Sequence, residues 1–248
     1  MSSFSLDQPL RGLALKVHCR IWLRRVSSVF NRSDLELLDE KELSVNRRFA
    51  TESLRARHAG AHALLRQALG RSLGCNAADL RFEAGENDRP RLSGYTGEMD
   101  FNLSHSGPYV ACAVVDSGRV GIDVEYVDCR MDYLTILDRV SSPKERSWIE
   151  SLSSCEARRA FYRLWVLKEA YAKARGDGLS LPFANITLTP RGDGFDLDFA
   201  ATGDCPDEWN FSRYGVNGDA MLAVAVHGSD MSRAGCGIEF VEGYDLLT

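Results

Sequence analysis

The chain has 248 residues, of which 44% are hydrophobic and 26% are charged, and its net charge is −5. This balance is typical of a folded protein with a substantial core, and it lacks the basic footprint of a nucleic-acid-binding protein. No apolar run reaches the roughly 18 residues that span a bilayer, and the polar start of the chain, Met1–Pro9, lacks the apolar core of a secretory signal. We therefore expect a cytoplasmic protein with neither a membrane nor a nucleic-acid partner.

The seven cysteines are scattered along the chain without a C-x-x-C pair. An odd number of cysteines at irregular spacing argues against a disulfide framework and against a thiolate zinc site. We expect reduced cysteines that are mostly buried.

Positive charge is concentrated in the first third of the chain. Residues 11–71 contain 13 Lys and Arg against 6 Asp and Glu, although the chain as a whole is acidic. Such a segment is either the solvated face of an arginine-rich helix, which composition favours, or a surface for an anionic small ligand or an acidic partner.

Hydrophobic periodicity predicts two long helices. Apolar residues recur about every 3.6 positions over Leu43–Leu73, and Gly74 is a suitable C-terminal stop. The second helix is expected over Ser154–Arg175, closed by the glycines at 176 and 178.

The segments between and after these helices have the pattern of strands. The apolar run Tyr109–Val115 indicates a strand buried on both faces, and Val120–Val127 alternates as a half-buried strand does, after a turn at Asp116–Arg119. Residues 85–98 have the composition of a loop or an edge strand, and we expect the residues from Gly228 on to form a mobile tail. The shorter strand-like runs are Met99–Leu103, Ile186–Thr189, Phe195–Phe199 and Met221–Val226. Helices mixed with hairpin-connected strands predict an α+β fold.

Asp123 and Glu125 lie in the predicted strand Val120–Val127, where alternate side chains share a face. Two carboxylates held together repel each other. A divalent cation such as Mg²⁺, which prefers carboxylate oxygens and substrate phosphates, would relieve that repulsion. The alternative is an edge strand with a solvated acidic face, and the D-x-E pattern alone leaves both interpretations open.

The second predicted helix carries Trp165, Glu169 and Lys173 on one face. The spacing of Glu169 and Lys173 is also that of an ordinary surface ion pair, worth well below about 1 kcal/mol. A buried Trp165 would instead place both charged residues beside packed structure. Glu169 would then add a third carboxylate to a magnesium site, and Lys173 would neutralise a phosphate there.

The small polar segment Asn102–Gly107 is predicted to lie at the turn between two strands. Its serines, its glycine and His105 would let backbone amides approach a phosphate closely. Considered alone, His105 is better described as a hydrogen-bonded turn histidine. It has no obvious nucleophile partner, so a Ser-His-Asp triad is a poor fit.

The first predicted helix contributes arginines and histidines. Arg57 and Arg66 carry planar guanidinium groups suited to bidentate phosphate binding. His58 and His62 have the spacing of a helical zinc site, but the residues between them supply no glutamate, so we discard zinc chemistry.

Taken in order, these segments resemble the Sfp-type 4′-phosphopantetheinyl transferases. The matched core covers residues 85–183, and the upstream arginine helix extends it to about residue 47. Arg89-Pro90 stands where the family often has Lys-Pro. The motif matches are Asn102–Tyr109 (N-[IL]-S-H-S-x-x-[YW]), Gly121–Glu125 (G-[IV]-D-[IV]-E), Ser142–Glu145 (F-S-x-x-E), Trp165–Lys173 (W-x-x-K-E-[AS]-x-x-K) and Gly176–Leu179 (G-x-G-L). Ser141 stands where the third of these motifs has its aromatic residue.

This resemblance implies a transfer of the 4′-phosphopantetheine group from coenzyme A to a serine of an apo acyl or peptidyl carrier protein, with release of 3′,5′-ADP. The reaction would depend on Mg²⁺, with Mn²⁺ as an alternative ion, and would activate fatty-acid, polyketide or nonribosomal peptide synthesis. By resemblance, Asp123, Glu125 and Glu169 hold the metal, Glu169 deprotonates the carrier serine, and Lys173 stabilises charge on the phosphate. The residues expected to bind coenzyme A are Arg57, Arg89, Ser104, His105, Lys168 and Lys173.

The resemblance also implies an α+β fold of two similar α/β halves related by a pseudo-twofold, in a monomer. Residues 1–119 would form the half that binds coenzyme A, and residues 120–248 would carry the magnesium site and the catalytic helix. Two rival functions are a non-catalytic binder of coenzyme A or of a carrier protein, and an unrelated magnesium-dependent phosphohydrolase. The presence of all three carboxylates and of Lys173 favours an active enzyme over the first, and the family motifs argue against the second.

Overall fold

The computed structural model of the protein describes residues 17–29, 31–85, 87, 89–191, 194–199, 202–229, 231, 236–242 and 246–247. The polar start Met1–Pro9 lies outside the described residues. Within the described ranges, no helix is both long enough and apolar enough to cross a membrane.

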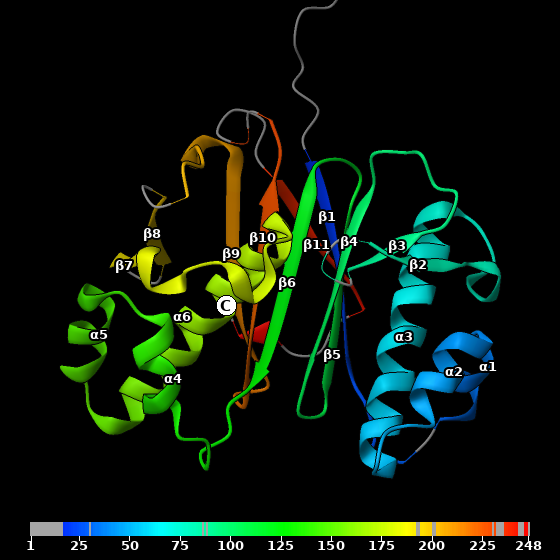
Figure 1. Cartoon of the computed structure of the whole chain (residues 1–248), viewed down its shortest axis with the longest axis horizontal. Coiled ribbons are helices and arrows are strands. Elements are labelled where there is room, and N and C mark those ends of the chain that lie inside the picture. The colour runs from blue at the N-terminus through cyan, green and yellow to red at the C-terminus, as the bar shows by residue number, and fades with distance from the viewer. Residues whose placement is uncertain are drawn as a thin grey trace, which may run out of the picture.

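The first half of the molecule is a four-stranded sheet with the strand order β11-β1-β5-β4. Strand β5 pairs antiparallel with β1 and with β4, whereas β11 pairs parallel with β1. The long helix α3 (Glu52–Leu73) covers the outer face of this sheet, on the right of Figure 1, beside the short helices α1 (Arg32–Leu37) and α2 (Glu40–Asn46). The strands of this half are β1 Val17–Arg25, β4 Asp100–Ser106, β5 Tyr109–Val115 and β11 Cys236–Glu242, with a small hairpin of β2 Phe82–Ala84 and β3 Pro90–Leu92.

The second half is a four-stranded sheet with the order β12-β9-β10-β6. Helix α6 (Ser154–Arg175) covers its outer face, with α4 (Tyr133–Val140) and α5 (Pro143–Glu150) further out, on the left of Figure 1. The strands of this half are β6 Arg119–Tyr126, β9 Trp209–Val216, β10 Ala220–His227 and β12 Leu246–Leu247, with a small hairpin of β7 Thr187–Arg191 and β8 Gly194–Asp198.

The two halves repeat one topology. In chain order, β1, α3 and the hairpin β4–β5 correspond to β6, α6 and the hairpin β9–β10. The sheet order β1-β5-β4 in one half is matched by β6-β10-β9 in the other. This repeat has the form that a pseudo-twofold requires. One strand departs from the division at Arg119, because β11, near the C-terminus, joins the sheet of the first half.

The inner faces of the two sheets form the central core. Alternate residues of β5, from Tyr109 to Val115, face the second sheet, whereas Val110, Cys112 and Val114 face α3. Val120, Ile122 and Val124 of β6 also belong to the central core. The molecule therefore has four layers, with α3 and α6 outside two packed sheets (Figure 1).

Several predicted elements are confirmed, and others need correction. The helix over Ser154–Arg175 and the strand Tyr109–Val115 have the predicted bounds. The predicted single helix Leu43–Leu73 is two helices, because the side chain of Thr51 caps α3 by accepting from the backbone N–H of Leu54. Strands β1, β9 and β11 were not predicted, and β11 shows that the residues after Gly228 are not simply a mobile tail.

The cysteines also differ from expectation. Cys19 and Cys112 are buried, whereas Cys75, Cys129, Cys155 and Cys205 are exposed. The prediction of mostly buried cysteines is therefore wrong.

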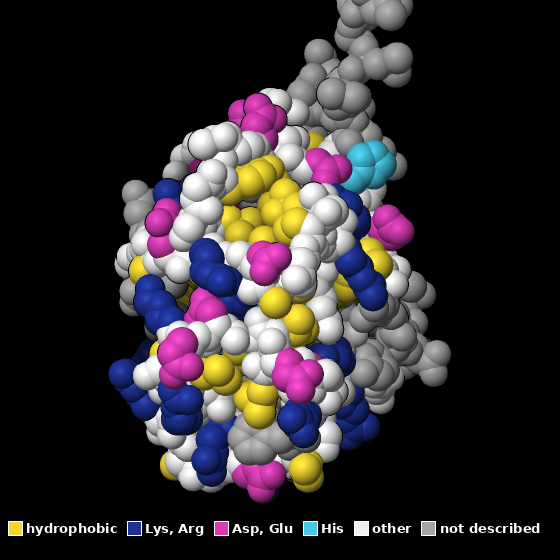
Figure 2. Space-filling view, turned by 90° about the vertical axis from the view of Figure 1, so that its right-hand side faces the viewer, with side chains coloured by type: hydrophobic (Ala, Val, Ile, Leu, Met, Phe, Trp, Pro, Cys, Tyr) yellow, Lys and Arg dark blue, Asp and Glu magenta, His cyan; other side chains and the backbone are white. Residues whose placement is uncertain are grey.

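The described part of the positive segment, residues 17–29 and 31–71, forms β1 and the helices α1, α2 and most of α3. Its helices lie on one face of the molecule. Figure 2 shows this face, with Lys and Arg gathered on its lower part among scattered acidic side chains. Two of the arginines pair with neighbouring acids, Arg32 with Glu36 and Arg47 with Glu40. This mixture fits the solvated helix face that composition favoured.

Candidate functional site

A cavity of about 530 Å³ lies between β4, β6 and the two long helices. Six of the nine predicted site residues line it. They are Ser104, His105, Asp123, Glu125, Glu169 and Lys173. The structure therefore joins segments that lie up to 69 positions apart in the chain.

The segment of small polar residues enters this cavity as part of a strand. Asn102 to Ser106 belong to β4, and the turn predicted for them is confined to Gly107 and Pro108. His105 is consequently a strand residue with an exposed side chain, while Ser104 is buried.

The pleat of β6 gives Asp123 and Glu125 their direction. Ile122 and Val124 point into the central core, so the two acidic side chains point to the opposite face, where α6 packs. Helix α6 lies unusually close to β6 at Gly121, because a Cβ atom there would be 2.0 Å from the carbonyl oxygen of Ala170. A glycine at this position thus lets helix residues reach the carboxylates of β6.

Trp165, Glu169 and Lys173 occupy successive turns on the cavity side of α6. The Nζ atom of Lys173 lies 2.7 Å from Asp123 Oδ1 and 3.0 Å from Ser104 Oγ. Lys173 therefore forms its ion pair with β6, across the cavity wall, and not with Glu169 one turn earlier on the helix.

Burial and mutual repulsion shift the acidity of two carboxyl groups. Burial and the Asp123 carboxylate raise the pKa of Glu169 to about 7. The same two causes raise the pKa of Glu125, although hydrogen bonds from Ser106 and Trp165 oppose the shift. Glu169 is therefore able to exchange a proton near neutral pH.

The donor set fits a divalent cation. Asp123 Oδ2 and Glu169 Oε1 are buried and have no hydrogen-bond partner among the described residues. Unsatisfied carboxylate oxygens are suited to a hard cation such as Mg²⁺. The described residues contain no ready-made cluster of three acidic, His or Cys ligands, and the Lys173 ammonium lies against Asp123 where a cation would compete with it.

Lys168 does not face the cavity. Its side chain is fully buried on another side of α6, where Nζ shares its three hydrogens among Glu145 Oε2, at 2.7 Å, and three backbone carbonyl oxygens. Glu145 in turn caps α5 by accepting from the backbone N–H of Ser142. The expectation that Lys168 contacts coenzyme A does not fit this position, because a buried and fully bonded ammonium has no donor left for a ligand.

Arg89 is also committed to the protein interior. Its guanidinium donates to Asp100, to the carbonyl oxygens of Phe101 and Val120, and to that of Lys173. These bonds tie the two halves together next to the cavity. The phosphate contact expected of Arg89 does not fit this arrangement.

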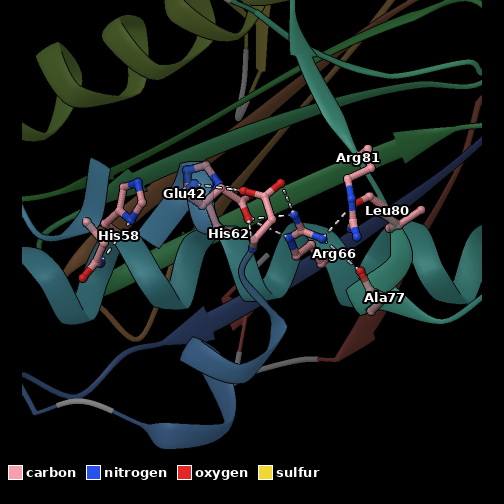
Figure 3. Close-up of polar contacts among 9 residues, drawn as sticks. Glu42, His58, His62, Arg66, Ala77, Leu80 and Arg81 are labelled. Atoms are coloured by element: carbon pink, nitrogen blue, oxygen red, sulfur yellow. Dashed lines mark hydrogen bonds and ion pairs between the residues drawn. The ribbon is translucent and has the colours of Figure 1, made fainter. Parts of the chain in front are cut away.

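The two arginines of α3 that were considered for phosphate binding differ in position. Arg57 Nη1 donates to the carbonyl oxygen of Gly107 at the β4–β5 turn and stays partly exposed. Arg66 is fully buried, and Figure 3 shows its guanidinium among Glu42, Ala77 and Leu80, with His62 on the other oxygen of Glu42. Only Arg57 of this pair is placed to meet a ligand.

A family comparison agrees with this site. The model of the 4′-phosphopantetheinyl transferase superfamily matches residues 119–225, which include all three carboxylates and Lys173. The chain belongs to this superfamily. The family assignment suggested by the motifs is confirmed.

Curated relatives carry the same family name. The chain is 35% identical over 156 residues to the 4′-phosphopantetheinyl transferase HetI of Nostoc sp., a match covering 62% of this chain and 66% of the relative. It is 34% identical over 131 residues to the 4′-phosphopantetheinyl transferase Sfp of Bacillus subtilis, covering 53% of this chain and 57% of the relative. The matches therefore span about two thirds or less of these relatives.

Solved structures of holo-(acyl-carrier-protein) synthases are similar to part of the chain. The enzyme of Bacillus anthracis str. Ames, in complex with CoA (3′,5′-ADP), aligns with a TM-score of 0.35 at 20% identity and covers 44% of this chain and 94% of its own. The enzyme of Thermotoga maritima aligns with a TM-score of 0.36 at 23% identity, covering 44% of this chain and 62% of its own.

Five residues that line the cavity were not predicted as site residues: His62, Pro90, Asn102, Leu103 and Trp165. Trp165 Nε1 donates to Glu125 Oε1 at 3.3 Å, and His62 of α3 lines the cavity. The position of Trp165 one turn before Glu169 was a usable signal for a cavity residue. No sequence signal connected His62 with β6, because their presence at one cavity depends on how the two halves pack.

Proposed function

We propose that this protein transfers the 4′-phosphopantetheine group of coenzyme A to a serine hydroxyl of an apo carrier protein and releases 3′,5′-ADP. The observation that carries the proposal is the meeting of Asp123, Glu125, Glu169 and Lys173 at one cavity. Phosphoryl transfer of this kind needs a deprotonated nucleophile and neutralisation of charge on the pyrophosphate, and these residue types supply both. The carrier would belong to fatty-acid, polyketide or nonribosomal peptide synthesis.

Asp123, Glu125 and Glu169 would hold Mg²⁺, or Mn²⁺ in its place. The ion would supply charge neutralisation on the pyrophosphate of coenzyme A. The two unpartnered carboxylate oxygens of Asp123 and Glu169 support this assignment.

Glu169 is the residue we propose to accept the proton of the carrier serine. Its carboxylate lines the cavity, and its Oε1 has no hydrogen-bond partner among the described residues, so that oxygen can accept a proton. Lys173 would place its ammonium against a phosphate oxygen, since it already lies at the cavity wall beside Asp123. His105 would contact the phosphates of coenzyme A, and Arg57 would hold the 3′-phosphate. Ser104 would reach a phosphate only by giving up its hydrogen bond to Asp123, because its single hydrogen is donated there.

A smaller apolar hollow of about 240 Å³ adjoins the cavity, and His62 and Pro90 line both. His58, Leu65 and Phe82 also line this hollow and supply aromatic and apolar surface of the kind that an adenine ring prefers, beside the charged residues Lys41, Glu42 and Glu83. We place the adenosine end of coenzyme A there. Because both halves of one chain border the combined site, we propose that the monomer is active.

The test is intact-protein mass spectrometry of an apo carrier protein incubated with this protein, coenzyme A and Mg²⁺. The expected result is a mass gain of one phosphopantetheine group, abolished by EDTA and by Asp123→Ala. Fatty-acid, polyketide and peptidyl carriers are tested in parallel, because the sequence does not name the carrier. Coenzyme A binding without mass gain on any of the three would identify a non-catalytic binder, and release of free phosphate or phosphopantetheine without a carrier would identify a phosphohydrolase.

A further inference from the structure

The facing edges of the two sheets, β4 and β6, are joined by a ladder of side-chain hydrogen bonds. Polar side chains at every second residue of β4 accept from backbone N–H groups at every second residue of β6. The rungs are Asp100 to Val120 (2.8 Å), Asn102 to Ile122 (2.9 Å), Ser104 to Val124 (3.3 Å) and Ser106 to Tyr126 (3.1 Å). The side chains of β4 thus stand in for the neighbouring strand that an edge strand lacks.

The two serine rungs also touch the carboxylates of the site. Ser104 Oγ lies 2.9 Å from Asp123 Oδ1, and Ser106 Oγ lies 2.6 Å from Glu125 Oε2. A serine hydroxyl has one hydrogen and two lone pairs. The backbone N–H of Tyr126 donates to Ser106, so the Ser106 oxygen acts as an acceptor there. The hydrogen of Ser106 is donated to Glu125.

Glu125 is therefore held from both sides. Ser106 donates to one carboxylate oxygen and Trp165 Nε1 to the other, at 3.3 Å. Each oxygen keeps a second lone pair for a cation. Without the Ser106 hydrogen bond, the carboxylate has one anchor and is free to rotate away from the cavity.

Resting on the proposed function, we propose that Ser106 is a positioning residue that orients Glu125 for metal binding. Ser106 is a cleaner test than Ser104, because its side chain touches only Glu125 among the proposed site residues. Ser104 also contacts Lys173 and is itself a candidate ligand contact. Within the described residues, Ser106 is not among those that line the cavity. Its influence on the site passes through Glu125.

Loss of such a supporting hydrogen bond costs a metal site about tenfold to a hundredfold in affinity. We expect Ser106→Ala to weaken Mn²⁺ binding by about tenfold or more. Ser106→Thr keeps the hydroxyl at a strand position that suits a β-branched residue, and it should retain the affinity. Asn102→Ala is the matched control, because Asn102 makes the same kind of rung to β6 without a hydrogen bond to either carboxylate of that strand.

The experiment titrates the full chain with Mn²⁺ alone and measures free ion by electron paramagnetic resonance, with thermal unfolding of each variant recorded beside it. Weak binding by Ser106→Ala, with retained binding by Ser106→Thr and Asn102→Ala, is the expected result. Equal affinity of Ser106→Ala and wild type overturns the inference, as does an equal loss in Asn102→Ala or a wild type that binds no Mn²⁺. A wild type that binds Mn²⁺ but modifies no carrier would contradict the proposed function without contradicting the role of Ser106.

Discussion

The ammonium of Lys173 on α6 lies 2.7 Å from Asp123 Oδ1 on β6, which closes an ion pair between two parts of the chain 50 positions apart. The same ammonium is a hydrogen-bond donor to Ser104 on β4. Lys173 thus compensates part of the negative charge of three carboxylates, and a bound divalent cation has to share Asp123 with it.

We predict opposite effects of Lys173→Met on metal binding and on transfer. Mn²⁺ should bind the protein alone more tightly, because a competing positive charge is gone. The rate of carrier modification should fall by about 100-fold or more, because a donor to the transferring phosphate is lost. Lys144→Met, which removes an exposed lysine of α5, is the control and should change neither quantity. Unchanged metal affinity together with an unchanged rate would contradict the assignment of Lys173.

Gly121→Ala should separate α6 from β6. The new Cβ atom would lie 2.0 Å from Ala170 O and 2.4 Å from Ala174 N, both backbone atoms that cannot move aside independently of the helix. We expect a loss of about 3 kcal/mol or more in the free energy of unfolding, measured in urea, and a loss of transfer activity in the protein that still folds. Gly228→Ala is the control, since its nearest neighbour would be the Met231 sulfur at 3.4 Å. Equal stability of the two variants would show that the close approach is not required.

The buried pair of Lys168 and Glu145 should act on stability and not on coenzyme A affinity. Lys168→Met leaves the Glu145 carboxylate buried without its cation, which typically costs about 3–5 kcal/mol. Adding Glu145→Gln removes the stranded charge and should restore part of the lost stability. Calorimetry of coenzyme A binding well below the unfolding temperature should show wild-type affinity. A large loss of coenzyme A affinity with little loss in the free energy of unfolding would instead show that Lys168 contacts the ligand.

His58 should make the fold sensitive to mild acid. Burial, followed by the nearby His62, lowers the pKa of His58 to about 4, with Glu42 opposing the shift and His105 adding to it. Between about pH 4 and the unfolded pKa of about 6.5, the unfolded chain binds more protons than the native protein, so stability falls as the pH falls through this window.

Urea unfolding across that window should therefore show a free energy of unfolding that depends less steeply on pH in His58→Gln than in the wild type. The difference in slope corresponds to up to about one proton bound on unfolding. His18→Gln, which replaces an exposed histidine of β1, should keep the wild-type slope. A wild-type slope in His58→Gln would assign the acid sensitivity to another group.

Local pattern was sufficient where a residue's role depends on its neighbours in the chain. The alternation of β6 predicted that Asp123 and Glu125 share a face, and the helical period predicted the common face of Trp165, Glu169 and Lys173. Both predictions are confirmed, because strand pleat and helix turn are set by the local backbone. The family motifs added the order of these segments.

Local pattern was insufficient where a role depends on packing between the halves. Arg89 and Lys168 have the sequence context of ligand-binding cations, yet their donors are taken by carbonyl oxygens and carboxylates from distant segments. The strand β11 was missed for a related reason, since it is stabilised by pairing with β1 at the other end of the chain.

The sequence by itself determined the chemistry available to this protein: three carboxylates, one lysine, and the strand and helix faces that carry them. The tertiary structure decided which polar side chains meet a ligand and which hold the frame. Ser106 illustrates the difference, because its hydroxyl became an anchor for Glu125 only when the edges of two sheets came together. Such contacts depend on long-range packing, and no local periodicity encodes them.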